Sequence, residues 1–163
     1  MISAQVQRGG VTLGAMPRGP NDPILSHAGR AVGIVDYRLA RNAIVEELRR
    51  GRLSRRDVCD AHPELLRAAR SVGSATSEAC PACDEGALVH VTFAFGARLP
   101  AGGRCVSSQR DAAQLARRAT EVACYVVEVC PSCAWNHLAR MFLTGGRSSA
   151  GRASREQATG KAP

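Results

Sequence analysis

Apolar residues recur every three or four positions in the segment that follows Asp36, which is the spacing of one face of an α-helix. Asp36 is suited to the N-cap, and Gly51 to the position just after the last turn. The pattern therefore predicts an amphipathic helix of about four turns. Its apolar positions are Tyr37, Ala40, Ile44 and Leu48.

Two shorter helices are predicted after Gly51. Ser54, with Asp57 three residues later, resembles a capping box, and Pro63 suits the first turn of a further helix that ends at Gly73. Together with the first helix, these segments predict a helical hairpin or a three-helix unit.

The hydrophobic period then changes from about 3.6 to 2, which indicates strands. Apolar residues alternate over 88–95 and over the β-branched run 122–129. A Gly/Pro-rich loop (96–103) and a predicted helix (108–118) lie between them, and we expect residues 135–143 to form a return strand. These segments predict a small antiparallel sheet of three strands.

Four cysteines stand in two matched turns, Cys80-Pro81-Ala82-Cys83 and Cys130-Pro131-Ser132-Cys133. Two Cys-x-x-Cys turns brought together supply the four thiolates of a tetrahedral Zn²⁺ site, so Cys80, Cys83, Cys130 and Cys133 are predicted to be the ligands of a structural zinc ion. A closed site has no open position for water, which argues against a catalytic role for the metal. Because the turns are further apart than in most zinc ribbons, the segment between them is predicted to be an insertion. The alternative is that the pairs are redox dithiols.

The predicted fold class is therefore α+β, with an N-terminal helical hairpin or three-helix unit followed by a small zinc-ribbon-like antiparallel sheet with a helical insertion. Residues 1–33 are predicted to be a disordered tail, 34–74 the helical region, 75–144 the zinc-ribbon-like region and 145–163 a second disordered tail. The tails are assigned from their Gly, Pro, Ser and Ala content.

The remaining cysteines and one histidine have less direct interpretations. Cys59, Cys105 and Cys124 lie in helix, loop and strand patterns and are expected to be small packing residues, with a ligand or nucleophile role as the alternative. His137, four residues after Cys133, is expected to be a polar strand residue, with metal ligation as the alternative.

Charge suggests where a partner would bind. The chain has a formal net charge of +8, but residues 71–143 contain six Arg and six acidic residues and are neutral. A neutral sheet is a poor surface for a phosphate backbone. The predicted contact with nucleic acid or an acidic partner is instead the arginine cluster between the first two helices. Its members are Arg49, Arg50, Arg52, Arg55 and Arg56. Trp135, beside the second cysteine turn, is expected either to pack over the metal loop or to contact a protein partner.

Five motifs recur in one known arrangement: Asp57 to Ala69, Cys80-Pro81-Ala82-Cys83, Val91 to Gly96, Gly103 to Val106 and Val126 to Leu138. Together they resemble an uncharacterised family of small actinobacterial proteins, catalogued only as a domain of unknown function. The resemblance covers residues 34–145 and implies a helical N-terminal part, a zinc-ribbon-like remainder and no known activity. Zinc ribbons often place Gly after the second cysteine of each turn, where φ is positive, whereas Asp84 and Ala134 stand there in this chain. The second turn is therefore expected to be slightly irregular.

The sequence thus predicts a non-enzymatic zinc-binding adaptor. We expect it to dock on the transcription or translation machinery through protein contacts, with RNA or DNA backbone as a further contact. The alternative is a thiol redox protein that uses the Cys-x-x-Cys pairs. A hydrolase is not indicated, because no His-Glu-x-x-His, Ser-His-Asp set or phosphate-binding Gly loop is present. With neither a long apolar run nor a signal-peptide pattern, the chain is expected to be cytoplasmic and to bind no membrane.

Overall fold

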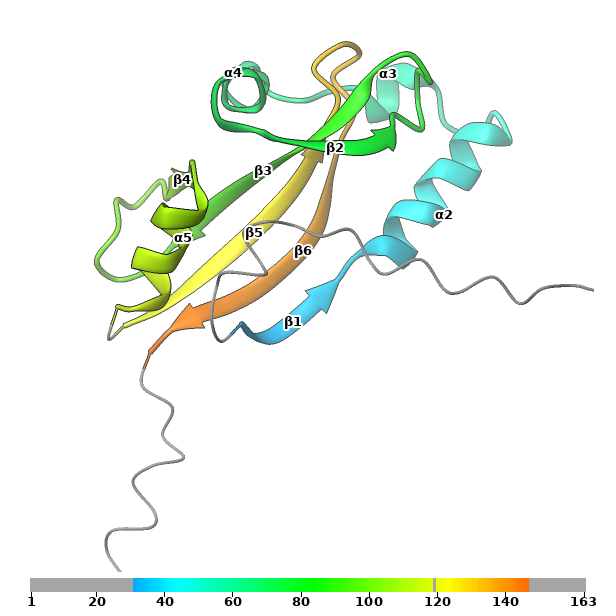
Figure 1. Ribbon diagram of the computed structural model, residues 1–163. Helices are drawn as coiled ribbons and strands as arrows, with labels where there is room; N and C mark the ends of the chain where they lie inside the picture. The colour runs from blue at the N-terminus through cyan, green and yellow to red at the C-terminus, as the bar shows by residue number, and fades with distance from the viewer. Residues whose placement is uncertain (1–30, 119, 147–163) are drawn as a thin grey trace, which may run out of the picture.

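Six strands form one antiparallel sheet in the computed structural model, which describes residues 31–118 and 120–146 (Figure 1). The strand order is β1-β6-β5-β3-β2, and β4 pairs with the same edge of β3 as β2, further along that strand. The strands are β1 (Val32–Asp36), β2 (Ser74–Ala79), β3 (Ala87–Phe95), β4 (Arg104–Val106), β5 (Glu121–Val129) and β6 (Asn136–Gly145).

Residue alternation in the central strand β5 defines the two faces of the sheet. Val122, Cys124 and Val126 point to one face, where they are buried together with Phe142 of β6. The helix α5 (Gln109–Ala116) covers this face with Ala112 and Leu115, and it begins at Ser108, whose side chain accepts a hydrogen bond from the backbone N–H of Asp111. Of the core clusters in the described chain, this one holds the most buried residues.

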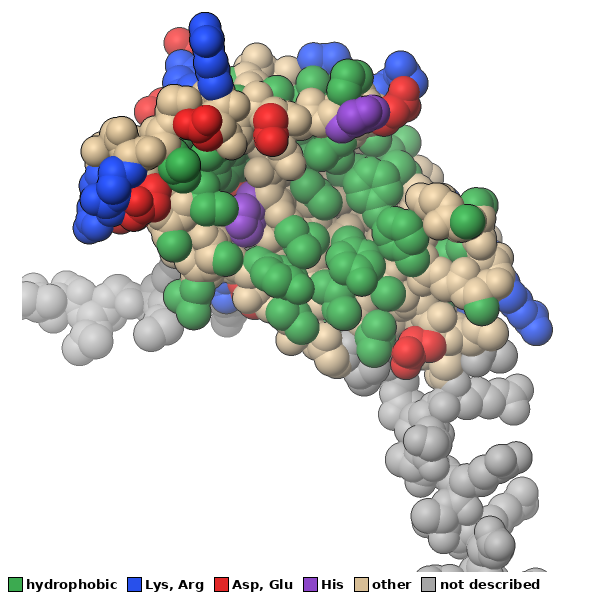
Figure 2. Space-filling model, turned by 180° about the vertical axis from the view of Figure 1, so that it is seen from behind, with side chains coloured by type: hydrophobic (Ala, Val, Ile, Leu, Met, Phe, Trp, Pro, Cys, Tyr) green, Lys and Arg blue, Asp and Glu red, His purple; other side chains and the backbone are tan. Residues whose placement is uncertain are grey.

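The opposite face of the sheet is only partly covered. The helix α4 (Pro63–Val72) packs Ala69 against Val91 of β3 and Val129 of β5. Beyond α4, the same face presents apolar side chains to solvent, as Figure 2 shows from behind. We call this area the open sheet face; it is lined by Phe93, Phe95, Tyr125, Val127 and Leu138.

Two further helices lie near the end of the sheet where the cysteines are. The helix α2 (Arg38–Arg49) buries Val45, and the one-turn helix α3 (Arg55–Val58) buries Val58, against Leu88 and Trp135. A capping box between Ser54 and Asp57 fixes the start of α3, as the sequence predicted. None of the helices in the described part of the chain is long and apolar enough to cross a membrane.

The predicted fold class is wrong. The structure is mostly one six-stranded sheet, and the segment before Ser74 does not form a helical hairpin or three-helix unit, since α2 and α4 make their main contacts with strands. The strand β1 precedes the helices and pairs with β6, so the sheet draws on both sides of the predicted boundary at residue 74. The helices cover parts of a larger sheet instead of forming a separate layer.

Three strands were not predicted, and the local sequence of each explains why. The strand β2 is polar and mostly exposed, so it lacks hydrophobic alternation. The strand β4 has three residues, and β1 contains Gly33 at φ +60° together with a register shift. The division into four parts stays a prediction, and the predicted tails at 1–33 and 145–163 fall almost entirely outside the described residues.

Candidate metal centre

Two β-hairpins bring the four cysteines to one end of the sheet. The turn between β2 and β3 holds Cys80 and Cys83, and the turn between β5 and β6 holds Cys130 and Cys133. Because β3 and β5 are antiparallel neighbours with Val89 opposite Val129, the start of β3 and the end of β5 lie at the same end of the sheet. The strand pairing alone therefore places the two hairpin tips side by side.

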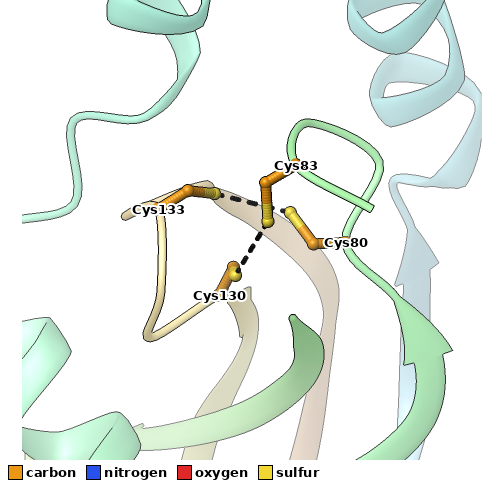
Figure 3. A group of neighbouring side chains, drawn as sticks. All are labelled: Cys80, Cys83, Cys130 and Cys133. Carbon is orange, nitrogen blue, oxygen red and sulfur yellow. Dashed lines mark hydrogen bonds between the residues drawn. The ribbon is translucent and has the colours of Figure 1, made fainter. Parts of the chain in front are cut away.

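The four sulfur atoms converge on one point (Figure 3). All lie within 4.8 Å of one another, and the sulfurs of Cys80 and Cys133 are 3.5 Å apart while those of Cys83 and Cys130 are 3.8 Å apart. Sulfurs bound to one tetrahedral ion at about 2.3 Å would be about 3.8 Å apart. The residues present therefore fit a single metal ion with four thiolate ligands, and this donor set suits soft or borderline metals.

Both cysteine turns have the same backbone. The N–H of Asp84 donates to the carbonyl of Cys80, and the N–H of Ala134 donates to the carbonyl of Cys130, each at 3.0 Å. Asp84 has φ +53° and Ala134 φ +67°, so both occupy the left-handed region that glycine usually fills here. The expected irregularity of the second turn is not seen: Ala134 adopts the required conformation despite its Cβ.

A glycine allows the two turns to approach each other. A Cβ built on Gly86 would lie 2.8 Å from the sulfur of Cys130 and 3.1 Å from Oγ of Ser132. The carbonyl of Gly86 also accepts a hydrogen bond from the N–H of Cys80 at 2.8 Å. Gly86 thus closes the first hairpin and gives room for the second, a role that its position three residues after Cys83 could have suggested.

Burial opposes the ionisation of the sulfurs when no cation is bound. Burial raises the pKa of Cys80, and it is also the largest cause of the raised pKa values of Cys130 and Cys133. Burial acts in the same direction on Cys83, but backbone N–H donors from Glu85 and Gly86, together with the neighbouring sulfurs of Cys133 and Cys80, lower its pKa to about 7. A divalent cation would stabilise all four thiolates, which is the electrostatic condition for a metal site.

An arginine lies beside the cluster. Desolvation lowers the pKa of Arg55, but the neighbouring sulfurs of Cys133, Cys59 and Cys83 raise it, and the net direction is upward. Four thiolates with a divalent cation carry a net charge of −2, so the guanidinium partly offsets the charge of a metal-bound site. One member of the predicted arginine cluster is therefore adjacent to the metal ligands.

The other arginines of that cluster are exposed, and two have carboxylate partners. Arg50 pairs with Glu46 one turn earlier on α2, and Arg52 forms a bidentate pair with Glu47. Arg49 and Arg56 are exposed at the end of α2 and in α3. Contact of this cluster with nucleic acid stays a prediction.

Trp135 has no exposed surface and cannot serve as a contact for a partner in this structure. That part of the site prediction is corrected, and the packing role that the sequence also allowed is the observed one. The indole Nε1 donates to Oε1 of Glu128 at 2.9 Å, and Nε of Arg41 on α2 donates to the same oxygen at 2.6 Å. The pattern of β5 signals this network, since Glu128 is the one acid among the inward-facing positions that end at the second cysteine turn.

His137 stacks on Trp135 with ring centroids 6.4 Å apart, and it is not part of the four-sulfur group. Cys124 is buried in the core below α5, and Cys105 lies against α4 on the other face. Cys59 is different, because its sulfur lies 3.7 Å from that of Cys133. No local pattern in the chain predicts this proximity, since Cys59 and Cys133 are 74 residues apart.

Fold and site together define a small antiparallel β-sheet protein with a four-cysteine cluster, suited to holding a metal ion, at the tips of two adjacent hairpins. Residues 29–159 match a family of unknown function, DUF5318, and the chain belongs to that family. This confirms the resemblance to an uncharacterised family.

The chain is similar to uncharacterized proteins of Mycobacterium bovis and of two strains of Mycobacterium tuberculosis. Each is 39% identical over 111 residues, which cover 68% of this chain and 81% of the relative. No solved structure matches the chain.

Proposed function

We propose that this protein is a non-enzymatic adaptor in which a structural zinc ion fixes two hairpins and the open sheet face binds a protein of the transcription or translation machinery. Zinc is the proposed metal because four thiolates at tetrahedral spacing are one of the ligand sets of closed structural zinc sites. The proposed compartment is the cytoplasm, where thiol ligands stay reduced.

The open sheet face is the observation that carries the adaptor role. It consists of aromatic and aliphatic side chains from three strands, and the rings of Phe95 and Tyr125 meet edge to face with centroids 5.6 Å apart. Apolar patches of this kind mark protein contacts in soluble proteins, and aromatic residues are enriched at their centres. Because no charged side chain lines this area, the partner surface is expected to be apolar.

The arginine cluster has a secondary part in this proposal. Arg50, Arg52 and Arg55 already have anionic neighbours, so Arg49 and Arg56 are the members best placed to contact phosphate. Two exposed arginines add a weak, salt-sensitive contact. We therefore propose that the open sheet face determines which partner binds, and that the arginines only strengthen the contact.

The thiol redox alternative finds less support in the geometry. Two close sulfur contacts within the four-cysteine group join different turns, Cys80 with Cys133 and Cys83 with Cys130. A dithiol enzyme would use the two sulfurs of a single Cys-x-x-Cys turn. The observed arrangement suits one shared ion better than two active sites.

The test is capture of tagged full-length protein from native cells, with and without nuclease. We expect RNA polymerase or ribosomal components to survive nuclease and to be lost when Phe95 and Tyr125 are both replaced by Asp. The matched control is Leu39→Asp, which charges a leucine that is 86% exposed on α2, away from the face. Metal content and circular dichroism must stay unchanged in both variants. Retention of the partner by the double variant, or its loss with nuclease alone, would refute the proposal.

A further inference from the structure

A fifth thiol is held against the four-cysteine centre. Cys59 follows α3 directly, and its sulfur is 3.7 Å from the sulfur of Cys133. Cys59 does not belong to the group whose sulfurs all lie within 4.8 Å of one another. It is therefore a neighbour of the ligand set and not a member of it.

The contact is built into the structure on both sides of Cys59. Before it, Val58 is buried in the cluster that also contains Trp135. After it, Asp60 accepts a hydrogen bond from Nδ2 of Asn136 at 3.0 Å, and the N–H of Ala61 donates to the carbonyl of Ala134 at 3.0 Å. These contacts hold the segment around Cys59 against the second cysteine turn, and they keep the sulfurs of Cys59 and Cys133 close together.

The exposures of the sulfurs are unequal. Cys80 and Cys130 are buried, whereas Cys83, Cys133 and Cys59 are partly exposed. A small oxidant from solvent therefore reaches Cys83 and Cys133 more readily than the buried ligands, and of these two Cys133 is the one beside Cys59. The remaining cysteines, Cys105 and Cys124, lie in other clusters.

We propose that Cys59 is the resolving thiol of a peroxide-sensitive metal centre in which Cys133 is the sulfur attacked first. The sulfur of Cys133 attacks one peroxide oxygen, an S–O bond forms and the O–O bond breaks, giving a sulfenic acid and water. The Cys59 thiol then attacks that sulfur, an S–S bond forms, and the oxygen leaves as a second water. Two thiols lose two electrons in total, and one peroxide is reduced to two waters.

The geometry suits the second step. The two sulfurs must approach by about 1.7 Å to reach disulfide bonding distance, and Cys59 lies outside regular helix, with φ −109° and ψ 63°. Loss of Cys133 leaves the metal three thiolates and an open position, so oxidation weakens metal binding. This proposal rests on the metal centre and not on the adaptor role.

The experiment treats the zinc-loaded full chain with hydrogen peroxide and maps disulfides by mass spectrometry after alkylation, while a chromogenic indicator follows free zinc. We expect a Cys59–Cys133 disulfide to appear together with zinc release, and both to reverse on addition of dithiothreitol and zinc. In Cys59→Ala, irreversible sulfinic acid on Cys133 should rise several-fold over the wild type, because the sulfenic acid lacks the neighbouring thiol that lies outside the ligand set. Cys105→Ala is the matched control and should behave as the wild type.

Three results would overturn the proposal. The first is a set of disulfides confined to the four ligand cysteines of the wild type, with Cys59 still reduced. The second is equal sulfinic acid on Cys133 in the wild type and in Cys59→Ala. The third is a chain that holds no metal when produced with zinc, which would also remove the structural zinc of the proposed function. Loss of the protein partner alone would leave this proposal intact.

Discussion

Removing the carboxylate of Glu128 is expected to destabilise the protein far more than removing an exposed one. The side chain of Glu128 is 4% exposed and that of Arg41 is 17% exposed, and the Nε of Arg41 lies 2.6 Å from Oε1 of Glu128. The same oxygen accepts from the fully buried Trp135. In Glu128→Ala, a largely buried guanidinium and a buried indole N–H would both lose their acceptor.

The magnitude follows from these two losses. Breaking a buried ion pair by removing one partner costs about 3–5 kcal/mol, and the partial exposure of Arg41 favours the lower end of that range. Glu128→Gln keeps the shape and one amide oxygen as acceptor, so it should cost about 1–2 kcal/mol, the difference between a charged and a neutral hydrogen bond. The control is Glu64→Ala. Glu64 pairs with Arg67, but the two side chains are 65% and 70% exposed, and the expected cost is below about 1 kcal/mol.

The assay is urea unfolding at saturating zinc, with the free energy of unfolding extrapolated to water for each variant. The order Glu128→Ala, Glu128→Gln, Glu64→Ala, from most to least destabilised, is the expected result. If Glu128→Ala loses no more stability than Glu64→Ala, then the buried network does not anchor α2 to the sheet and the reasoning fails. The Gln variant keeps the test valid if the Ala variant does not fold.

Three further outcomes are expected from the metal centre. In a chelator competition, Gly86→Ala should bind zinc much more weakly than the wild type, because the added Cβ would lie 2.8 Å from the sulfur of Cys130. The control is Gly102→Ala, whose added Cβ would meet nothing within 4 Å and which should bind zinc as the wild type does. Ala134→Gly should raise the free energy of unfolding by about 1 kcal/mol by relieving the positive φ, and a loss of stability would contradict that strain. Zinc affinity should fall as pH falls, because protons compete for the sulfurs. The pKa of Cys83 is about 7 and the pKa values of the other three ligand thiols are raised, so zinc binding near neutral pH displaces three to four protons. Zinc affinity should therefore change by roughly a thousandfold or more per pH unit. A change of only tenfold would refute this proton count.

Local signals in the sequence found most elements but not their assembly. The alternation in 88–95 and 122–129 located β3 and β5, the run after Trp135 located β6, and Ser108 marked the start of α5. Capping residues and Pro63 likewise marked α3 and α4. These signals depend on neighbours along the chain, which is why one sequence is enough to read them.

The errors concern contacts between distant segments. The pairing of β1 with β6 has no local signature, and the polar edge strand β2 has no buried face to impose alternation. For the site, the spacing of the cysteines within each turn predicted which four would meet. The packing of Trp135 on Glu128, the close approach at Gly86 and the contact of Cys59 all join elements whose relative placement the sequence does not encode locally.

The position of the two cysteine turns also bears on how the chain folds. Each turn closes a hairpin between strands adjacent in sequence, so each half of the ligand set can form early from local contacts. Bringing the halves together requires the pairing of β3 with β5 across the intervening loop, β4 and α5, and closure of that long loop is the slower step. The four sulfurs therefore come together in the same step that assembles the centre of the sheet. A metal ion that binds the two sulfurs of one hairpin first would keep that hairpin folded until the second hairpin pairs with it.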